Sequence, residues 1–217
     1  MQNQLVRILF FCGVFIFFVT PQSSMAKEIV TKCAALIKSS VKPKENQLVR
    51  EAIIFAKAHH KGQFRKFDGL PYITHPIRVA EIVKKHSQDF ELIIAAYLHD
   101  LLEDTAVTRI QIEQRFGKRV ASIVSELTTN EDKLDELGSK TTYLTQKMMA
   151  MSFGALLIKL ADRLDNVSDF ENADPHFILQ YRLETQRILS GVERRIDLPR
   201  AHRKLMRQIY EAMLSGV

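Results

Sequence analysis

Apolar residues recur at every third or fourth position through most of the chain, and this period constrains the fold more than any other feature. Within residues 45–60, one helical face would carry the apolar side chains Leu48, Val49, Ala52, Ile53 and Ala56. Similar segments follow as far as residue 215, and we find no sustained alternation of the kind that marks a half-buried strand. With only 8 glycines and 6 prolines in 217 residues, the pattern predicts an all-α fold of about eight to ten helices.

Helix-capping residues predict where several of these helices begin. Pro76 and Pro175 each occupy a position suited to the first helical turn, where proline is favoured. Thr108 and Gln111 have the spacing of a capping box, in which two side chains satisfy free backbone N–H groups. Gly117 would end the short helix that Thr108 begins. These signals predict a series of short helices without an obvious internal domain boundary.

The first 26 residues differ in character from the rest of the chain. One positive charge, Arg7, precedes an unbroken apolar run of about a dozen residues, which is short for a membrane span. Small and polar residues follow, so residues 1–26 have the three regions of a secretory signal peptide. We therefore expect an exported protein, periplasmic or secreted, in which residues 27–217 form a single domain. An uncleaved anchor, or a cytoplasmic protein that starts at Met25, would explain the same sequence.

Four ionisable residues end the apolar segment AAYLHDLLEDT at residues 95–105, and they are His99, Asp100, Glu103 and Asp104. If residues 92–104 form one helix, His99 lies one turn from Glu103, and Asp100 lies one turn from Asp104. Carboxylates gathered so closely repel one another and are costly to bury, and a bound cation would relieve that cost. A solvated helix end would explain these four residues equally well, so the hypothesis needs support from elsewhere in the chain.

A second histidine and a lone aspartate give that support. His75 stands at a helix start, and Asp162 lies among the apolar residues of LLIKLADRLDN, where it needs a partner. Taken singly, His75 would serve as a helix cap, and Asp162 would pair with Lys159 or Arg163. Taken together, two histidines and two aspartates favour one divalent ion per chain, Mn²⁺, Fe²⁺ or Zn²⁺, with water completing its coordination. The predicted metal ligands are His75, His99, Asp100 and Asp162.

Five ordered segments of the chain resemble one protein family. The segments are HKGQFRK, PYITHPIRVA, LHDLLEDT, FGKRVASIVSELT and IKLADRLDN. They are similar to the hydrolase domain of RelA/SpoT proteins and to the small metazoan SpoT homologues, which are HD-domain phosphohydrolases. The resemblance covers residues 45–190, and it implies an HD-domain helical bundle. It also implies a stand-alone enzyme that uses Mn²⁺ to remove the 3′-pyrophosphate of (p)ppGpp.

The resemblance also assigns roles to individual residues. It implies the same four metal ligands, because the family signature reads His, then His-Asp, then Asp. Glu103 and Asp104 match a Glu-Asp pair that activates the attacking water in the family. The residues that match substrate-binding positions of the family are Arg65, Lys66, Asn166 and Tyr181. The chemistry agrees, since Arg65 can contact phosphate with two parallel hydrogen bonds.

Two positions depart from the family pattern. Asp135-Glu136 stands where relatives carry a Pro-Lys pair whose lysine holds substrate phosphate, and Phe177 stands where an arginine is expected. Two acids would repel a highly anionic nucleotide. Export would also separate the enzyme from (p)ppGpp, which is a cytosolic nucleotide. An HD-type phosphatase acting on another nucleotide, such as NADPH, is therefore the main alternative.

The charge of the chain suggests a further class. The net charge of +6 suits a nucleic-acid-binding protein as well as an enzyme for phosphorylated substrates. Near the C-terminus, one side of a helix could carry the basic residues Arg194, Arg195, Arg200, Arg203, Lys204 and Arg207. Such runs are more often solvated faces, so nucleic-acid binding is a weaker hypothesis, as is a non-catalytic interaction protein. We expect a small-molecule nucleotide as the partner, and the sequence leaves the oligomeric state open.

Overall fold

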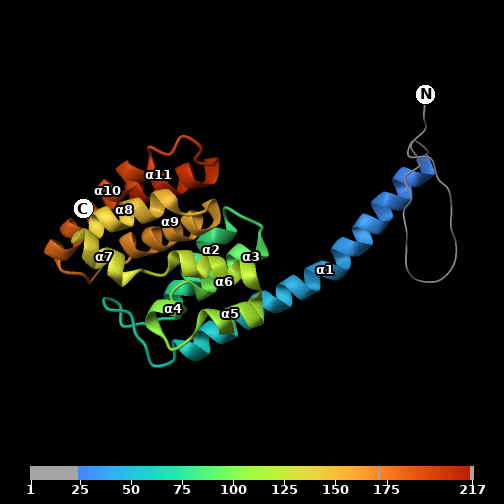
Figure 1. The fold of residues 1–217 in the computed structure, drawn as a ribbon, viewed down its shortest axis with the longest axis horizontal. Coiled ribbons are helices and arrows are strands. Elements are labelled where there is room, and N and C mark those ends of the chain that lie inside the picture. The colour runs from blue at the N-terminus through green and yellow to red at the C-terminus, as the bar shows by residue number, and fades with distance from the viewer. Residues whose placement is uncertain (1–23, 171, 216–217) are drawn as a thin grey trace. The chain divides into compact units, whose positions relative to one another are not determined.

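The computed structural model describes residues 24–170 and 172–215, and these residues form eleven helices and no strand. The only pairing of β type among them is an isolated bridge between Phe64 and Pro71. The helices are α1 (Ser24–His59), α2 (Thr74–Lys84), α3 (Phe90–Leu98), α4 (Leu101–Asp104), α5 (Arg109–Phe116), α6 (Lys118–Leu127), α7 (Glu131–Leu137), α8 (Lys140–Ala150), α9 (Phe153–Val167), α10 (Pro175–Val192) and α11 (Arg200–Ser215). The all-α prediction is confirmed (Figure 1).

The chain divides into two compact units, residues 1–47 and residues 48–217. The described part of the first unit is the beginning of α1, and the second unit contains all the other helices. Most of the predicted signal peptide, residues 1–23, lies outside the described residues, so that prediction stays untested. Across the described ranges, no helix combines the length and the apolar character that a membrane span requires.

The second unit is built around α2, α3, α6 and α9, which pack against one another (Figure 1). α9 is largely buried, and its buried apolar residues include Leu156, Ile158, Leu160 and Ala161. α11 packs on α9, and α10 packs on α8. Burial of each leucine or isoleucine side chain stabilises the fold by about 1.5–3 kcal/mol. α9 is therefore a rigid support for any polar residue that it carries.

The predicted caps position the helices of this unit. Thr108 and Gln111 form the capping box that begins α5, and Gly117 ends it with a positive φ of 94°. Pro175 lies in the first turn of α10, whose N-terminus is capped by Asp174. On α11, the basic residues Arg200, Arg203, Lys204 and Arg207 are exposed, as expected for a solvated face.

Candidate active site

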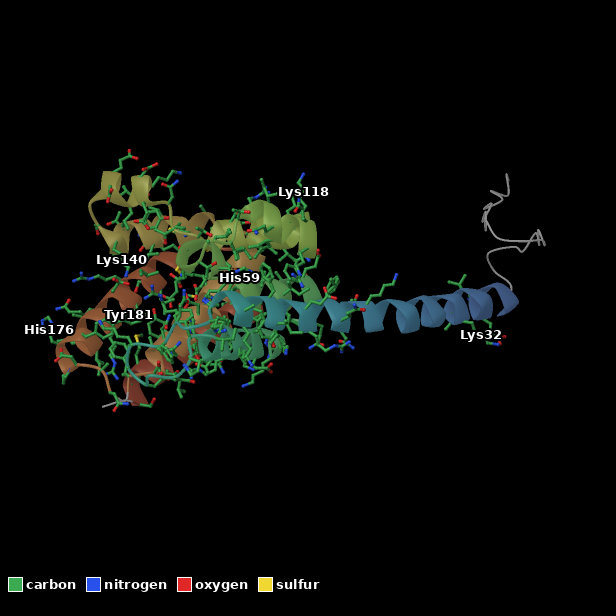
Figure 2. All side chains as sticks on the ribbon, turned by 90° about the horizontal axis from the view of Figure 1, so that it is seen from below. Lys32, His59, Lys118, Lys140, His176 and Tyr181 are labelled. Carbon is green, nitrogen blue, oxygen red and sulfur yellow. The ribbon has the colours of Figure 1, made fainter. Side chains whose placement is uncertain are left out.

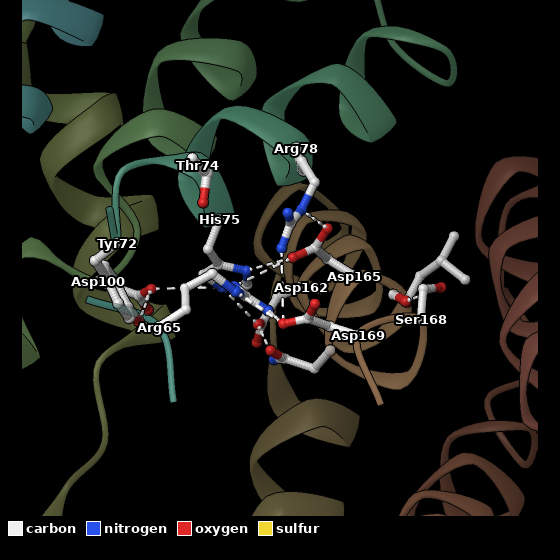
Figure 3. Close-up of polar contacts among 12 residues, drawn as sticks. Arg65, Tyr72, Thr74, His75, Arg78, Asp100, Asp162, Asp165, Ser168 and Asp169 are labelled. Carbon is white, nitrogen blue, oxygen red and sulfur yellow. Dashed lines mark hydrogen bonds and ion pairs between the residues drawn. The ribbon is translucent and has the colours of Figure 1, made fainter. Parts of the chain in front are cut away.

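The four predicted metal ligands come from three separate places in the chain and meet in the second unit. Figure 3 labels three of them, His75, Asp100 and Asp162. His75 lies in the first turn of α2, His99 and Asp100 lie between α3 and α4, and Asp162 lies on α9. All four are buried, with 2%, 2%, 8% and 7% of their surface exposed. One ligand atom from each of His75, His99 and Asp100 lies within 4.8 Å of the others, which is close enough to share one ion.

Both histidines direct Nε2 at a predicted aspartate ligand, His75 at both aspartates and His99 at Asp100. His75 Nε2 lies 3.2 Å from Asp162 Oδ1 and 3.6 Å from Asp100 Oδ2. His99 Nε2 lies 3.1 Å from Asp100 Oδ2, and it is buried without a hydrogen bond of suitable geometry. A buried ring nitrogen in this state fits a metal ligand, because coordination would use its lone pair. The donor set therefore fits a divalent ion.

The segment that carries His99 and Asp100 is not one continuous helix. α3 ends at Leu98 and α4 begins at Leu101, although the Asp104 N–H still donates to the Asp100 carbonyl over 2.9 Å. Asp100 has φ −95° and ψ −6°, in the sparsely populated region where many active-site residues lie. The single helix considered for residues 92–104 is therefore wrong at this point, because the Asp100 backbone departs from helical geometry.

Asp162 has two partners besides His75. Lys159 Nζ lies 2.9 Å from Asp162 Oδ2, so the salt bridge expected with Lys159 exists, whereas Arg163 pairs with Glu184. Asn166 donates a hydrogen bond to Asp162 Oδ1 over 2.7 Å. Burial alone would raise the pKa of Asp162, but Lys159 and His75 hold it well below the usual range. Asp162 is therefore an ionised carboxylate with one oxygen directed at the predicted metal site.

The acid pair Glu103 and Asp104 lies at the exposed edge of this cluster, on α4. The Glu103 carboxylate accepts a hydrogen bond from the Thr129 N–H, and the Asp104 carbonyl accepts one from Gln63 over 2.8 Å. Partial burial and the nearby charge of Asp100 raise the pKa of the Asp104 carboxyl. A carboxylate with a raised pKa is better suited to general acid–base catalysis at neutral pH.

Arg65, one of the predicted substrate-binding residues, is held by aspartates. Its side chain is only 7% exposed, and its guanidinium pairs with Asp169 and lies 3.4 Å from Asp165 and 3.7 Å from Asp68. The Nε–H of Arg65 donates to Asp169 Oδ2 over 2.9 Å. Its positive charge is therefore largely balanced within the protein, and phosphate binding by Arg65 stays a prediction.

The other predicted substrate-binding residues lie nearby in an aromatic setting. Lys66 Nζ lies over the rings of Phe67 and Phe177, at 5.5 Å and 5.3 Å from their centroids. Tyr181, on α10 (Figure 2), packs against Phe170 and Phe177 with centroid separations of 5.5 Å and 5.9 Å. Asn166 is the only one of the four that contacts a predicted metal ligand directly. Their roles toward a nucleotide stay predictions.

Sequence reasoning missed Asp165, which is buried beside the cluster. Its Oδ2 lies 2.7 Å from His75 Nδ1, and its Oδ1 accepts a hydrogen bond from Arg78 Nε over 2.7 Å (Figure 3). The one available signal was its spacing, because Asp162 and Asp165 are three residues apart on α9 and share a helical face. That spacing alone cannot tell a buried partner of His75 from a solvated aspartate.

The charge of His75 leads to a prediction about metal binding. Burial alone would lower the pKa of His75, but its hydrogen bonds to Asp162 and Asp165 raise it to about 9. A metal ligand must be a neutral imidazole, so a divalent ion has to displace this proton. We expect the apparent affinity for Mn²⁺ to rise about tenfold per pH unit from roughly pH 7 to 9, and then to level off. Calorimetry in two buffers of different ionisation enthalpy measures the protons released, and no release at neutral pH would contradict this expectation.

Comparisons with known proteins agree with this geometry. The sequence profile of the family described as HD domain matches residues 52–197. The chain is 37% identical over 137 residues to the human guanosine-3′,5′-bis(diphosphate) 3′-pyrophosphohydrolase MESH1, covering 62% of this chain and 75% of that protein. It is 34% identical over 183 residues to the bifunctional (p)ppGpp synthase/hydrolase SpoT of Escherichia coli K12. That match covers 82% of this chain but only 26% of SpoT, so the chain spans about a quarter of that relative's length.

A solved structure gives the same relationship in three dimensions. It is the structure of a metazoan orthologue of SpoT, described as hydrolysing ppGpp and acting in starvation responses. The two chains superpose with a TM-score of 0.67 and are 26% identical, over 78% of this chain and 95% of the orthologue. The similarity therefore extends over nearly the whole of that smaller protein.

Proposed function

This chain belongs to the HD-domain family, together with the guanosine-3′,5′-bis(diphosphate) 3′-pyrophosphohydrolases, and on that premise we propose that it removes the 3′-pyrophosphate of (p)ppGpp. The observation that carries the proposal is the buried group of His75, His99 and Asp100, whose ligand atoms lie within 4.8 Å of one another, with Asp162 Oδ1 3.2 Å from His75 Nε2 and the acid pair nearby on α4. The products would be pyrophosphate and guanosine 5′-diphosphate from ppGpp, or guanosine 5′-triphosphate from pppGpp, formed by the addition of one water molecule.

We propose Mn²⁺ as the ion, one per chain. Two imidazoles and two carboxylates, with water in the remaining positions, suit Mn²⁺, Fe²⁺ or Zn²⁺, and the family resemblance favours the first of these. A divalent ion at such a site lowers the pKa of a bound water and polarises a phosphoryl oxygen. The partly buried Lys159 leaves the net charge of the two aspartates and this lysine at −1, which still attracts a cation.

The remaining chemistry belongs to residues of the chain itself. Glu103 and Asp104 lie one turn beyond Asp100, where either carboxylate can accept a proton from water. Tyr72 donates a hydrogen bond to Asp100 Oδ2 over 2.8 Å, and this contact holds the ligand in place. Lys66, the neighbour of Arg65 in the chain, is exposed and can contact phosphate as a point charge.

The proposed activity is tested by a hydrolysis screen of the full-length chain. Purified protein is incubated with Mn²⁺ and, separately, with ppGpp, pppGpp, NADPH and GTP, and the products are separated by chromatography. We expect release of pyrophosphate from ppGpp and pppGpp, and none after the metal is removed with a chelator. Orthophosphate without pyrophosphate, or rapid turnover of NADPH with no reaction of ppGpp, would favour the alternative HD-type phosphatase.

We also propose that the protein is exported, as the N-terminal charge and the apolar run that follows it indicate. N-terminal sequencing of protein from its native cell tests this proposal. A mature chain that begins near Lys27, outside the cytoplasm, is the expected result. A cytoplasmic chain that begins at Met25 would contradict export and would place the enzyme with a cytosolic nucleotide.

A further inference from the structure

The two ring nitrogens of His75 face different aspartates, and only those at Nε2 are proposed metal ligands. Nε2 faces the carboxylates of Asp100 and Asp162, which belong to the proposed metal site. Nδ1 lies 2.7 Å from Asp165 Oδ2, on the other side of the ring, and both residues are buried. An imidazole that donates its Nδ1–H to a carboxylate keeps its lone pair on Nε2, which is the form that binds a metal.

Two arginines also contact the Asp165 carboxylate and hold it in place. Arg78, one helical turn after His75 on α2, donates its Nε–H to Asp165 Oδ1 over 2.7 Å. Arg65 Nη1 lies 3.4 Å from Asp165 Oδ2, the oxygen that also contacts His75. These contacts give Asp165 a single side-chain orientation, so the ring of His75 is held by a rigid acceptor.

The second histidine of the site is held in a different way. His99 Nδ1 lies 2.9 Å from the carbonyl oxygen of Ala96, a neutral acceptor within its own segment. A hydrogen bond to an ionised carboxylate is about twice as strong as one to a neutral group. The carboxylate also makes the imidazole a better electron donor toward a metal. Of the two histidines, His75 is therefore the one whose binding strength depends on a charged residue outside the ligand set.

We propose that Asp165 is a positioning residue, which orients the ring of His75 and selects Nε2 as its metal-binding nitrogen. α9 then supplies both the ligand Asp162 and, one turn further along, the residue that orients the ligand from α2. The inference rests on the proposed metal centre and does not depend on which nucleotide is the substrate.

The test measures metal affinity in the full-length chain with Asp165→Asn. An asparagine oxygen can still accept the Nδ1–H, but it lacks the negative charge and cannot pair with Arg78 in the same way. We expect the affinity for Mn²⁺, measured by calorimetry, to fall about 10–100-fold. Bound Co²⁺ should show an altered visible absorption spectrum, which a purely structural role would leave unchanged. The chelator-treated variant should keep the helical circular dichroism of the unaltered chain.

Asp169→Asn is the matched control. Asp169 carries the same charge just after α9 and contacts the same two arginines, with Arg78 Nη2 at 3.8 Å, but its recorded contacts do not include His75. Its substitution should change the affinity for Mn²⁺ by no more than about fivefold, as for a partly exposed ion pair. A large loss in both variants would point to the total charge of the network and would overturn the positioning role.

A measurement on the unaltered chain keeps the inference testable even if Asp165→Asn does not fold. In the Zn²⁺-loaded protein, ¹⁵N resonances of His75 should show a protonated Nδ1 and a metal-shifted Nε2. Metal on Nδ1, or unchanged affinity and Co²⁺ spectrum in Asp165→Asn, would overturn the inference and leave the proposed metal centre intact. Failure of the unaltered chain to bind any divalent ion would instead overturn the metal centre, and the role of Asp165 with it.

Discussion

Replacement of Asp162 by alanine is expected to leave the full-length protein without bound metal and without turnover above background. Asp162 is one of only two carboxylates among the proposed ligands, and its Oδ1 lies 3.2 Å from His75 Nε2. Its loss removes a ligand and also brings the net charge of the two aspartates and Lys159 from −1 to zero, because Lys159 remains. Metal analysis of the purified variant, together with the ppGpp hydrolysis assay, measures both effects. Full metal occupancy in Asp162→Ala would contradict the ligand assignment.

The same substitution should also destabilise the fold, and a second variant separates the two effects. Without Asp162, the partly buried Lys159, whose side chain is 17% exposed, loses its closest partner, and the unpaired charge costs up to about 3–5 kcal/mol. Replacing both residues, with Asp162→Ala and Lys159→Met, removes that charge and should recover most of the stability. Urea unfolding in the presence of a chelator measures this recovery. The double variant should be stable and still lack metal, which excludes misfolding as the cause of the loss.

Substitution of Glu103 or Asp104 should differ from Asp162→Ala, because the metal should be retained while turnover is lost. Glu103→Gln and Asp104→Asn each preserve the shape of the side chain, and the glutamine oxygen can still accept from the Thr129 N–H. A general acid–base group typically contributes about 10²–10⁴-fold to the rate, so we expect a fall in kcat of that size in at least one variant. Bound metal, measured in the same preparations, should stay at one ion per chain.

A surface acid provides the control for this pair. Glu113 lies on α5 and forms an exposed ion pair with Arg109 over 3.0 Å, so Glu113→Gln removes the same charge away from the cluster. It should leave kcat nearly unchanged, because exposed ion pairs contribute little. Near-normal turnover in both Glu103→Gln and Asp104→Asn would show that neither carboxylate takes part in proton transfer.

The parts of the fold that sequence predicts well are those that depend on local spacing. The helical period of the apolar residues predicted an all-α chain, and Thr108 with Gln111 predicted the capping box that begins α5. Asp162 stood out because a lone acid on an apolar helix needs a partner, and the structure gives it two charged ones, Lys159 and His75. In each case the signal lies within a few residues.

The features that sequence did not predict depend on pairing between distant residues. His75 and Asp165 are 90 positions apart, and Arg65 and Asp169 are 104 positions apart, so no local pattern relates them. The family resemblance predicted that Arg65 binds phosphate, and no sequence signal indicated the three aspartates that lie close to it. The break at Asp100 was also missed, because it depends on backbone angles that the residue type does not determine.

The short helix α4 has a consequence for how the site moves. A helix of four residues cannot persist by itself, because helix formation has a costly nucleus. It is held by the buried Leu101 and by contacts of Glu103 and Asp104 with Thr129 and Gln63. Local opening of this turn should therefore need far less free energy than unfolding of the buried helix α9. The backbone amides of the acid pair should exchange their hydrogens with solvent quickly, while those around the ligand on α9 stay protected.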